Sequence, residues 1–81
     1  MLLIMESLKT LTELDIGQTA NIVQLLSTGS MRRRLQDLGM IEGTIVECLH
    51  KSPCGDPIAY LIRGAAIALR TEDSSNILIS I

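Results

Sequence analysis

The sequence predicts a mainly β protein: a small closed barrel of five short strands, with one short inserted helix and a helical turn near the N-terminus. Most of the chain consists of short β-branched and aliphatic runs separated by turn residues at close spacing, as in small barrels. One segment has the apolar periodicity of a helix. The chain has 81 residues, 47% of them hydrophobic, which suits one small domain with a dense core.

The N-terminal region is expected to begin loosely and then to turn. Residues 1–7 are predicted to be a flexible lead-in, and residues 8–81 a single domain. Leu8, Leu11 and Leu14 recur every three residues, which favours a short helical turn there.

The inserted helix follows the first predicted strand, at 19–26, after a polar break. Met31, Leu35 and Leu38 fall at positions i, i+4 and i+7, which places them on one face of a helix of about two turns. Gly39 comes directly after them, where a left-handed conformation suits glycine. We therefore expect Gly39 to end the helix.

The remainder of the chain alternates as strands do. Ile58, Tyr60 and Ile62 are predicted to point inward, which leaves Leu61 facing outward on the same strand. The other predicted elements are strands at 44–50, 58–63, 67–69 and 77–79, a compact loop at 52–57, a turn at Gly64 and a helical turn at 71–74.

Composition and charge exclude several common roles of small β-barrels. The formal net charge is −2, and Tyr60 is the single aromatic residue. A nucleic-acid binder needs a basic field and often aromatic platforms, so we expect no nucleic-acid partner. The aromatic groove that holds proline-rich peptides is missing as well.

Localisation is expected to be cytoplasmic. The N-terminus has no basic flank and a short apolar run, unlike a secretory signal, and no stretch is apolar for long enough to span a bilayer. Cys48 and Cys54 should therefore remain reduced thiols, and direct membrane insertion is not expected.

Three segments carry a recognisable pattern: Arg34-Leu35-Gln36-Asp37-Leu38-Gly39-Met40 with Gly43, Pro53-Cys54-Gly55-Asp56-Pro57-Ile58, and Ala68-Leu69-Arg70. In this order, and over most of the chain, they resemble the FeoA family. Glu42 stands where that family usually has proline, and Ser52 and Cys54 fill positions often held by alanine and an aliphatic residue.

The resemblance implies an SH3-like barrel and a role in ferrous-iron uptake beside FeoB, the membrane Fe²⁺ transporter. The chain would then be a non-enzymatic accessory protein that docks on the cytoplasmic part of the transporter, and that associates with the membrane through it. The alternative is a small metal-sensing module related to the C-terminal barrel of iron-dependent repressors, or a stand-alone relative that regulates a DNA-binding protein. No phosphate-binding loop is present, and the lone His50 has no evident nucleophile beside it, so no enzymatic activity is expected.

The first docking candidates are Arg32, Arg33 and Arg34 on the predicted helix, with Leu61 on a strand. Successive helical residues point about 100° apart, so the three arginines should splay apart. They are expected either to be solvated, with one paired to Asp37, or to include one or two that contact a partner. An outward Leu61 could belong to an exposed apolar patch that binds the transporter or a second copy of the chain.

The loop residues Gly55, Asp56 and Pro57 are the remaining docking candidates. A structural role would be enough to account for these residue types in the loop, because glycine allows a positive φ and aspartate can accept a hydrogen bond from its own turn. In the alternative role, this loop presents a rigid surface to the transporter.

Cys48, His50 and Cys54 are the metal-ligand candidates. Cys48 and His50 are predicted to share a strand face, with Cys54 across the loop. A closed zinc site wants four ligands, so the set is incomplete, and Cys48 is expected to be a buried hydrophobe. No cofactor should be required, and Fe²⁺ or Zn²⁺ would bind either adventitiously or as a regulator.

Overall fold

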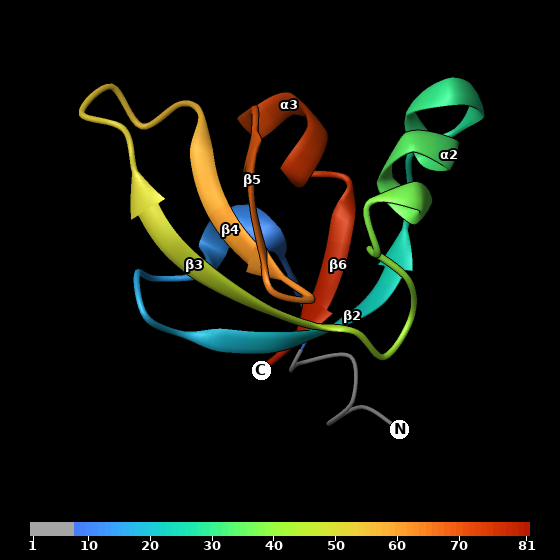
Figure 1. The fold of residues 1–81 in the computed structure, drawn as a ribbon, viewed down its shortest axis with the longest axis horizontal. Coiled ribbons are helices and arrows are strands. Elements are labelled where there is room, and N and C mark those ends of the chain that lie inside the picture. The colour runs from blue at the N-terminus through green and yellow to red at the C-terminus, as the bar shows by residue number, and fades with distance from the viewer. Residues whose placement is uncertain (1–7) are drawn as a thin grey trace.

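The computed structural model describes residues 8–81, and the predicted lead-in at 1–7 lies outside the described residues. One antiparallel sheet in the order β1-β6-β2-β3-β4-β5 curls around the core (Figure 1). Its strands are β1 (Leu8–Thr10), β2 (Thr19–Leu25), β3 (Ile45–Lys51), β4 (Ile58–Ile62), β5 (Ala65–Leu69) and β6 (Ile77–Ser80). The helices are the 3₁₀ turn η1 (Leu11–Glu13), α2 (Gly29–Asp37) and α3 (Thr71–Ser74). The mainly β class is confirmed, and the sheet stays open between its edges, β1 and β5.

The N-terminal region differs from the prediction, which placed the helical turn from Leu8 onward. Leu8–Thr10 instead forms β1, which pairs with β6, so that residues 8–81 contain six strands rather than five. The turn begins only at Leu11, and the Glu13 carboxylate accepts a hydrogen bond from the Thr10 N–H at 2.8 Å. The three-residue spacing suits a 3₁₀ turn, but pairing with β6 offers backbone hydrogen-bond partners to Leu8–Thr10.

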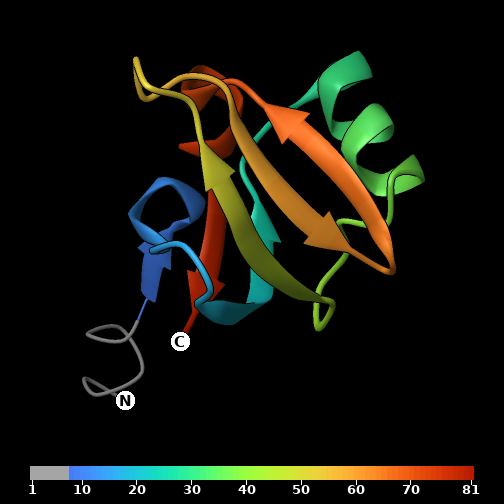
Figure 2. The ribbon, with the colours of Figure 1, turned by 60° about the vertical axis from the view of Figure 1, so that its left-hand side comes forward.

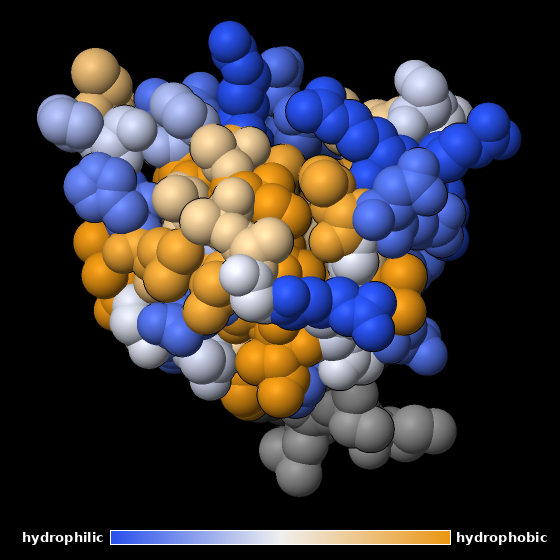
Figure 3. Space-filling model, in the orientation of Figure 1, coloured by the Kyte–Doolittle hydropathy of each residue, from blue (hydrophilic) through white to orange (hydrophobic). Residues whose placement is uncertain are grey.

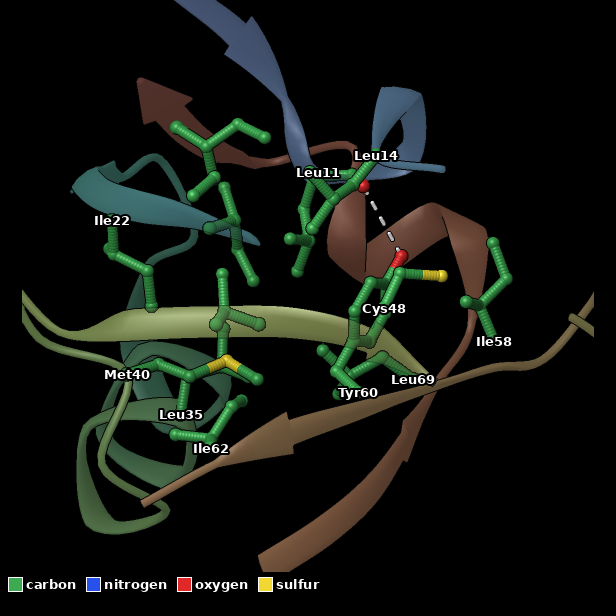
Figure 4. Packing of buried hydrophobic residues seen from close by; sticks show 14 of the residues in the cluster. Leu11, Leu14, Ile22, Leu35, Met40, Cys48, Ile58, Tyr60, Ile62 and Leu69 are labelled. Carbon is green, nitrogen blue, oxygen red and sulfur yellow. Dashed lines mark hydrogen bonds between the residues drawn. The ribbon is translucent and has the colours of Figure 1, made fainter. Parts of the chain in front are cut away.

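The core is almost wholly aliphatic and has Tyr60 at its centre (Figure 4). Tyr60 is fully buried, and its hydroxyl donates a hydrogen bond to the Leu11 carbonyl oxygen at 3.3 Å. This bond ties η1 to β4. Burial raises the pKa of Tyr60 to about 12. The other fully buried hydrophobic side chains are Leu11, Leu14, Ile22, Leu35, Met40, Val46, Cys48, Ile62, Ile77 and Ile79.

Helix α2 is inserted between β2 and β3 and lies alongside β5 (Figure 2). Leu35 is fully buried and anchors the helix to the core. The helix ends as predicted, because Gly39 has a φ of +102°. The N–H groups of Gly39 and Met40 donate to the carbonyls of Gln36 and Leu35, both at 3.0 Å, the pattern of a Schellman cap. None of the helices in residues 8–81 is long and apolar enough to cross a bilayer.

Candidate partner-docking surface

The outer side of β3, β4 and β5 carries a continuous apolar surface, here called the apolar face. Ala59 lies opposite Ala68, and Leu61 lies opposite Ala66, in the register of β4 and β5. Ile45 of β3 is 63% exposed and lies diagonally beyond Leu61. Figure 3 shows apolar side chains gathered across the middle of this side of the molecule, between hydrophilic borders.

Leu61 faces outward, as the alternation of β4 predicted. Ile58, Tyr60 and Ile62 are buried, whereas Leu61 is only half-buried. Its docking role stays a prediction. Glu47 of β3 lies opposite Leu61 and gives the apolar face a charged border.

Arg32, Arg33 and Arg34 are exposed and splay around α2, so they form no single patch. Arg32 Nη1 donates to the Leu25 carbonyl oxygen at 2.8 Å and fastens α2 to the end of β2. It is the one arginine of the three whose guanidinium donates a hydrogen bond to another described residue. Arg33 and Arg34 are exposed, and their docking role stays a prediction.

The loop that contains Gly55, Asp56 and Pro57 is exposed, and hydrogen bonds of its own residues stabilise it. Gly55 has a φ of +85°, as expected of a turn glycine. Asp56 acts differently from the prediction: its Oδ1 accepts a hydrogen bond from the Thr71 N–H at 2.9 Å, at the start of α3. Ser52 Oγ donates to the Pro57 carbonyl oxygen at 2.7 Å and closes the loop. The Asp56 carboxylate therefore joins the loop to α3 across the fold.

The three metal-ligand candidates do not converge. A β-bulge after Cys48 shifts the pairing of β3, so that Cys48 opposes buried Tyr60 while His50 opposes Ala59 on the outside. The prediction that Cys48 and His50 share a face is therefore wrong. Cys48 is fully buried, and burial raises the pKa of its thiol, whereas Cys54 is exposed on the loop. Within residues 8–81, no three His, Cys, Asp or Glu side chains gather as a metal site would require.

A second surface feature was not predicted. A pocket of about 140 Å³ opens where α2, the end of β5 and α3 meet. Arg34 and Arg70 reach it from opposite halves of the sequence, so no local pattern could have indicated it. Its lining residues are Met31, Arg34, Leu35, Ala68, Leu69, Arg70 and Asp73.

Comparison with known proteins identifies the fold and the relatives of this chain. The family model described as the FeoA domain matches residues 9–81. A curated relative from Porphyromonas gingivalis (strain ATCC BAA-308 / W83), named Fe(2+) transport protein A/Fe(2+) transporter FeoB fusion protein, is 33% identical over 67 residues. The match covers 83% of this chain and 8% of that relative, so this chain spans a small part of the relative's length.

Solved structures agree with the family match. The solution structure of FeoA from Chlorobium tepidum is 32% identical, with a TM-score of 0.84, covering 89% of this chain and 69% of that one. The zinc complex of FeoA from Stenotrophomonas maltophilia, described as a prokaryotic SH3 domain protein, is 29% identical, with a TM-score of 0.75 and 88% of each chain covered. The expected SH3-like class is therefore confirmed. T. acidophilum IdeR shares the fold alone, at 21% identity with a TM-score of 0.81, over 93% of this chain and 34% of that one.

Proposed function

This chain belongs to the FeoA family, and from that membership we propose that it is a non-enzymatic accessory protein of Fe²⁺ uptake that docks on the cytoplasmic part of a FeoB-type transporter. The observation that carries the proposal is the P. gingivalis relative, whose name joins Fe(2+) transport protein A and FeoB in one polypeptide. Fusion of two modules makes their contact intramolecular and raises their effective concentration. A shared polypeptide therefore suits two modules that act by binding each other.

The apolar face is the surface that we propose for this contact. Ala59, Ala66 and Ala68 carry short side chains beside Leu61, which suits close packing against a partner. Contiguous exposed apolar surface on a small protein commonly marks a protein contact. Glu47 at its border and Arg33 on α2 would contribute to orientation and association rate more than to affinity.

We also propose that this role requires no resident metal and involves no catalysis, and that the protein works in the cytoplasm beside the membrane. Support for the first point comes from the separation of Cys48, inside the core, from His50 and Cys54 outside it. Fe²⁺ is the transported ion in this proposal, not a cofactor. The zinc in the S. maltophilia complex belongs to that protein, and the ligand candidates of this chain do not favour a metal-sensing role.

The test is a calorimetric titration of the purified chain against the cytoplasmic region of the FeoB-type transporter from the same organism. Leu61→Asp places a charge in the apolar face and should weaken binding by about tenfold or more, because about 1.4 kcal/mol corresponds to tenfold in affinity. The matched control is Leu78→Asp, since Leu78 is likewise half-buried on a strand, β6, remote from that face. It should bind like the wild type.

Folding and self-association are measured on the same variants. Leu61 is half-buried, so its replacement should cost about 1 kcal/mol of unfolding free energy and leave the circular dichroism spectrum unchanged. Sedimentation velocity shows whether the apolar face joins two copies instead of the transporter. Equal loss of binding in both variants, or no loss in a folded Leu61→Asp, would refute the proposed surface. No binding by the wild type would refute the docking role.

A further inference from the structure

The pocket between α2, β5 and α3 combines two cationic side chains with an apolar wall. Arg34 comes from α2 and Arg70 from the residue that follows β5, and both are exposed. Leu35 and Leu69, next to them in the sequence, are buried. Each arginine therefore extends from a backbone position that the core fixes, and both residues line the same cavity.

The backbone at Arg70 is held firmly by α3. The N–H groups of Asp73 and Ser74 both donate to the Arg70 carbonyl oxygen, each at 3.0 Å. The Thr71 N–H is occupied by the Asp56 carboxylate, which fixes the first residue of α3. Preorganisation of this kind lowers the conformational-entropy cost that ligand binding must offset.

The size of the pocket suits one side chain of a ligand. Its volume of about 140 Å³ is close to the roughly 150 Å³ of an engineered cavity that binds one benzene molecule. Met31, Leu35 and Leu69 contribute apolar lining. A ligand that fills this pocket should combine an anionic head with aliphatic carbon.

The formal charges select a monoanion. Arg34 and Arg70 contribute two positive charges, and Asp73 contributes one negative charge at the same pocket, which leaves a net charge of +1. Guanidinium groups bind carboxylates through paired, charge-assisted hydrogen bonds. The Asp73 carboxylate would repel a phosphate dianion more strongly than a ligand carboxylate, which carries a single negative charge.

We propose that this pocket binds the carboxylate of an acidic side chain carried by an aliphatic segment of a partner protein. Ala68 belongs both to the pocket lining and to the apolar face, so the two surfaces are continuous. A protein that packs on the apolar face can place an acidic residue in the pocket without leaving the surface. The proposal stands on the pocket residues themselves and does not depend on the identity of the transporter.

The test is an NMR titration of the ¹⁵N-labelled full chain with the peptide N-acetyl-Leu-Glu-Leu-amide, in the absence of any transporter. Amide shifts should change with the peptide at the C-terminal half of α2 and at 69–73, and should saturate. The peptide N-acetyl-Leu-Gln-Leu-amide, which lacks the charge, should bind at least about tenfold more weakly, as expected from the loss of a charge-assisted contact of about 1.4 kcal/mol or more. Inorganic phosphate serves as the third probe and should bind more weakly than the Glu peptide.

Variants separate the pocket from general charge effects. Arg34→Gln and Arg70→Gln should each weaken binding of the Glu peptide by about tenfold. Arg33→Gln is the matched control, because it removes the same charge from the same helix outside the pocket lining. Asp73→Asn should strengthen binding several-fold, since it removes the carboxylate that opposes the ligand.

The outcomes are decisive in either direction. Because Arg34 and Arg70 are exposed, their replacement should preserve the dispersed NMR spectrum, and if one variant unfolds the other decides. Equal weakening by Arg33→Gln, equal binding of the Gln peptide, tighter binding of phosphate, or weaker binding by Asp73→Asn would each overturn the proposal. These results would leave the transporter titration unaffected, so the two proposals fail separately.

Discussion

Replacement of Gly39 by alanine should destabilise the fold through two separable effects. Gly39 has a φ of +102°, which L-residues rarely adopt. A Cβ placed there would lie 2.7 Å from Arg63 Cδ and 3.3 Å from Arg63 Cγ. The first effect is backbone strain, and the second is a steric clash between α2 and the turn that joins β4 to β5.

The two effects can be given magnitudes. A left-handed conformation costs an L-residue roughly 1–2 kcal/mol, and displacing the Arg63 side chain from its rotamer costs about 0.5–1.5 kcal/mol. Alanine also lowers the conformational entropy of the unfolded chain, which stabilises the folded state by about 0.4–1 kcal/mol. The net loss is about 2 kcal/mol, equivalent to a fall in Tm of roughly 8–16 °C for a domain of this size.

Thermal and urea unfolding, followed by circular dichroism, measure the loss. Gly55→Ala is the matched control, because Gly55 has a φ of +85° and a Cβ added to it would meet nothing within 4 Å, so it reports strain alone. In an Arg63→Ala background the cost of Gly39→Ala should fall by about 1 kcal/mol, the coupling expected of residues in contact. An unchanged Tm for Gly39→Ala would refute the assignment of the helix cap. Additive effects of the two substitutions would refute the clash.

Two further predictions concern contacts that join distant parts of the chain. Asp56→Ala should cost about 1 kcal/mol and speed amide exchange at Thr71, as measured by NMR, because a capping acceptor is lost; Asp56→Asn, which keeps an oxygen, should cost less. Tyr60→Phe should cost about 1 kcal/mol in urea unfolding at neutral pH. The folded chain holds the Tyr60 proton up to a pKa of about 12, above the unfolded value of 10.0, so wild-type stability should fall as pH rises through this range. Tyr60→Phe should flatten that fall, and an identical slope in both proteins would show that Tyr60 is not the titrating group.

Much of the fold could be predicted because its information is local. Alternation along β4 identified Ile58, Tyr60 and Ile62 as inward and Leu61 as outward, and helical spacing followed by Gly39 located α2 and its end. These patterns depend on the pitch of a strand or helix, which neighbouring residues determine by themselves. The FeoA-like segments then placed the chain in its family.

Tertiary pairing decided what local patterns could not. Leu8–Thr10 became a strand because β6 offered it backbone partners, and a bulge in β3 turned His50 to the outside while Cys48 stayed in the core. Strand register and long-range contacts arise from residues that meet only when the chain folds. The sequence by itself therefore determined the class of fold and the outward position of Leu61, which depend on local patterns. Only the tertiary structure brought Arg34 and Arg70 to one pocket, because they are far apart in the sequence.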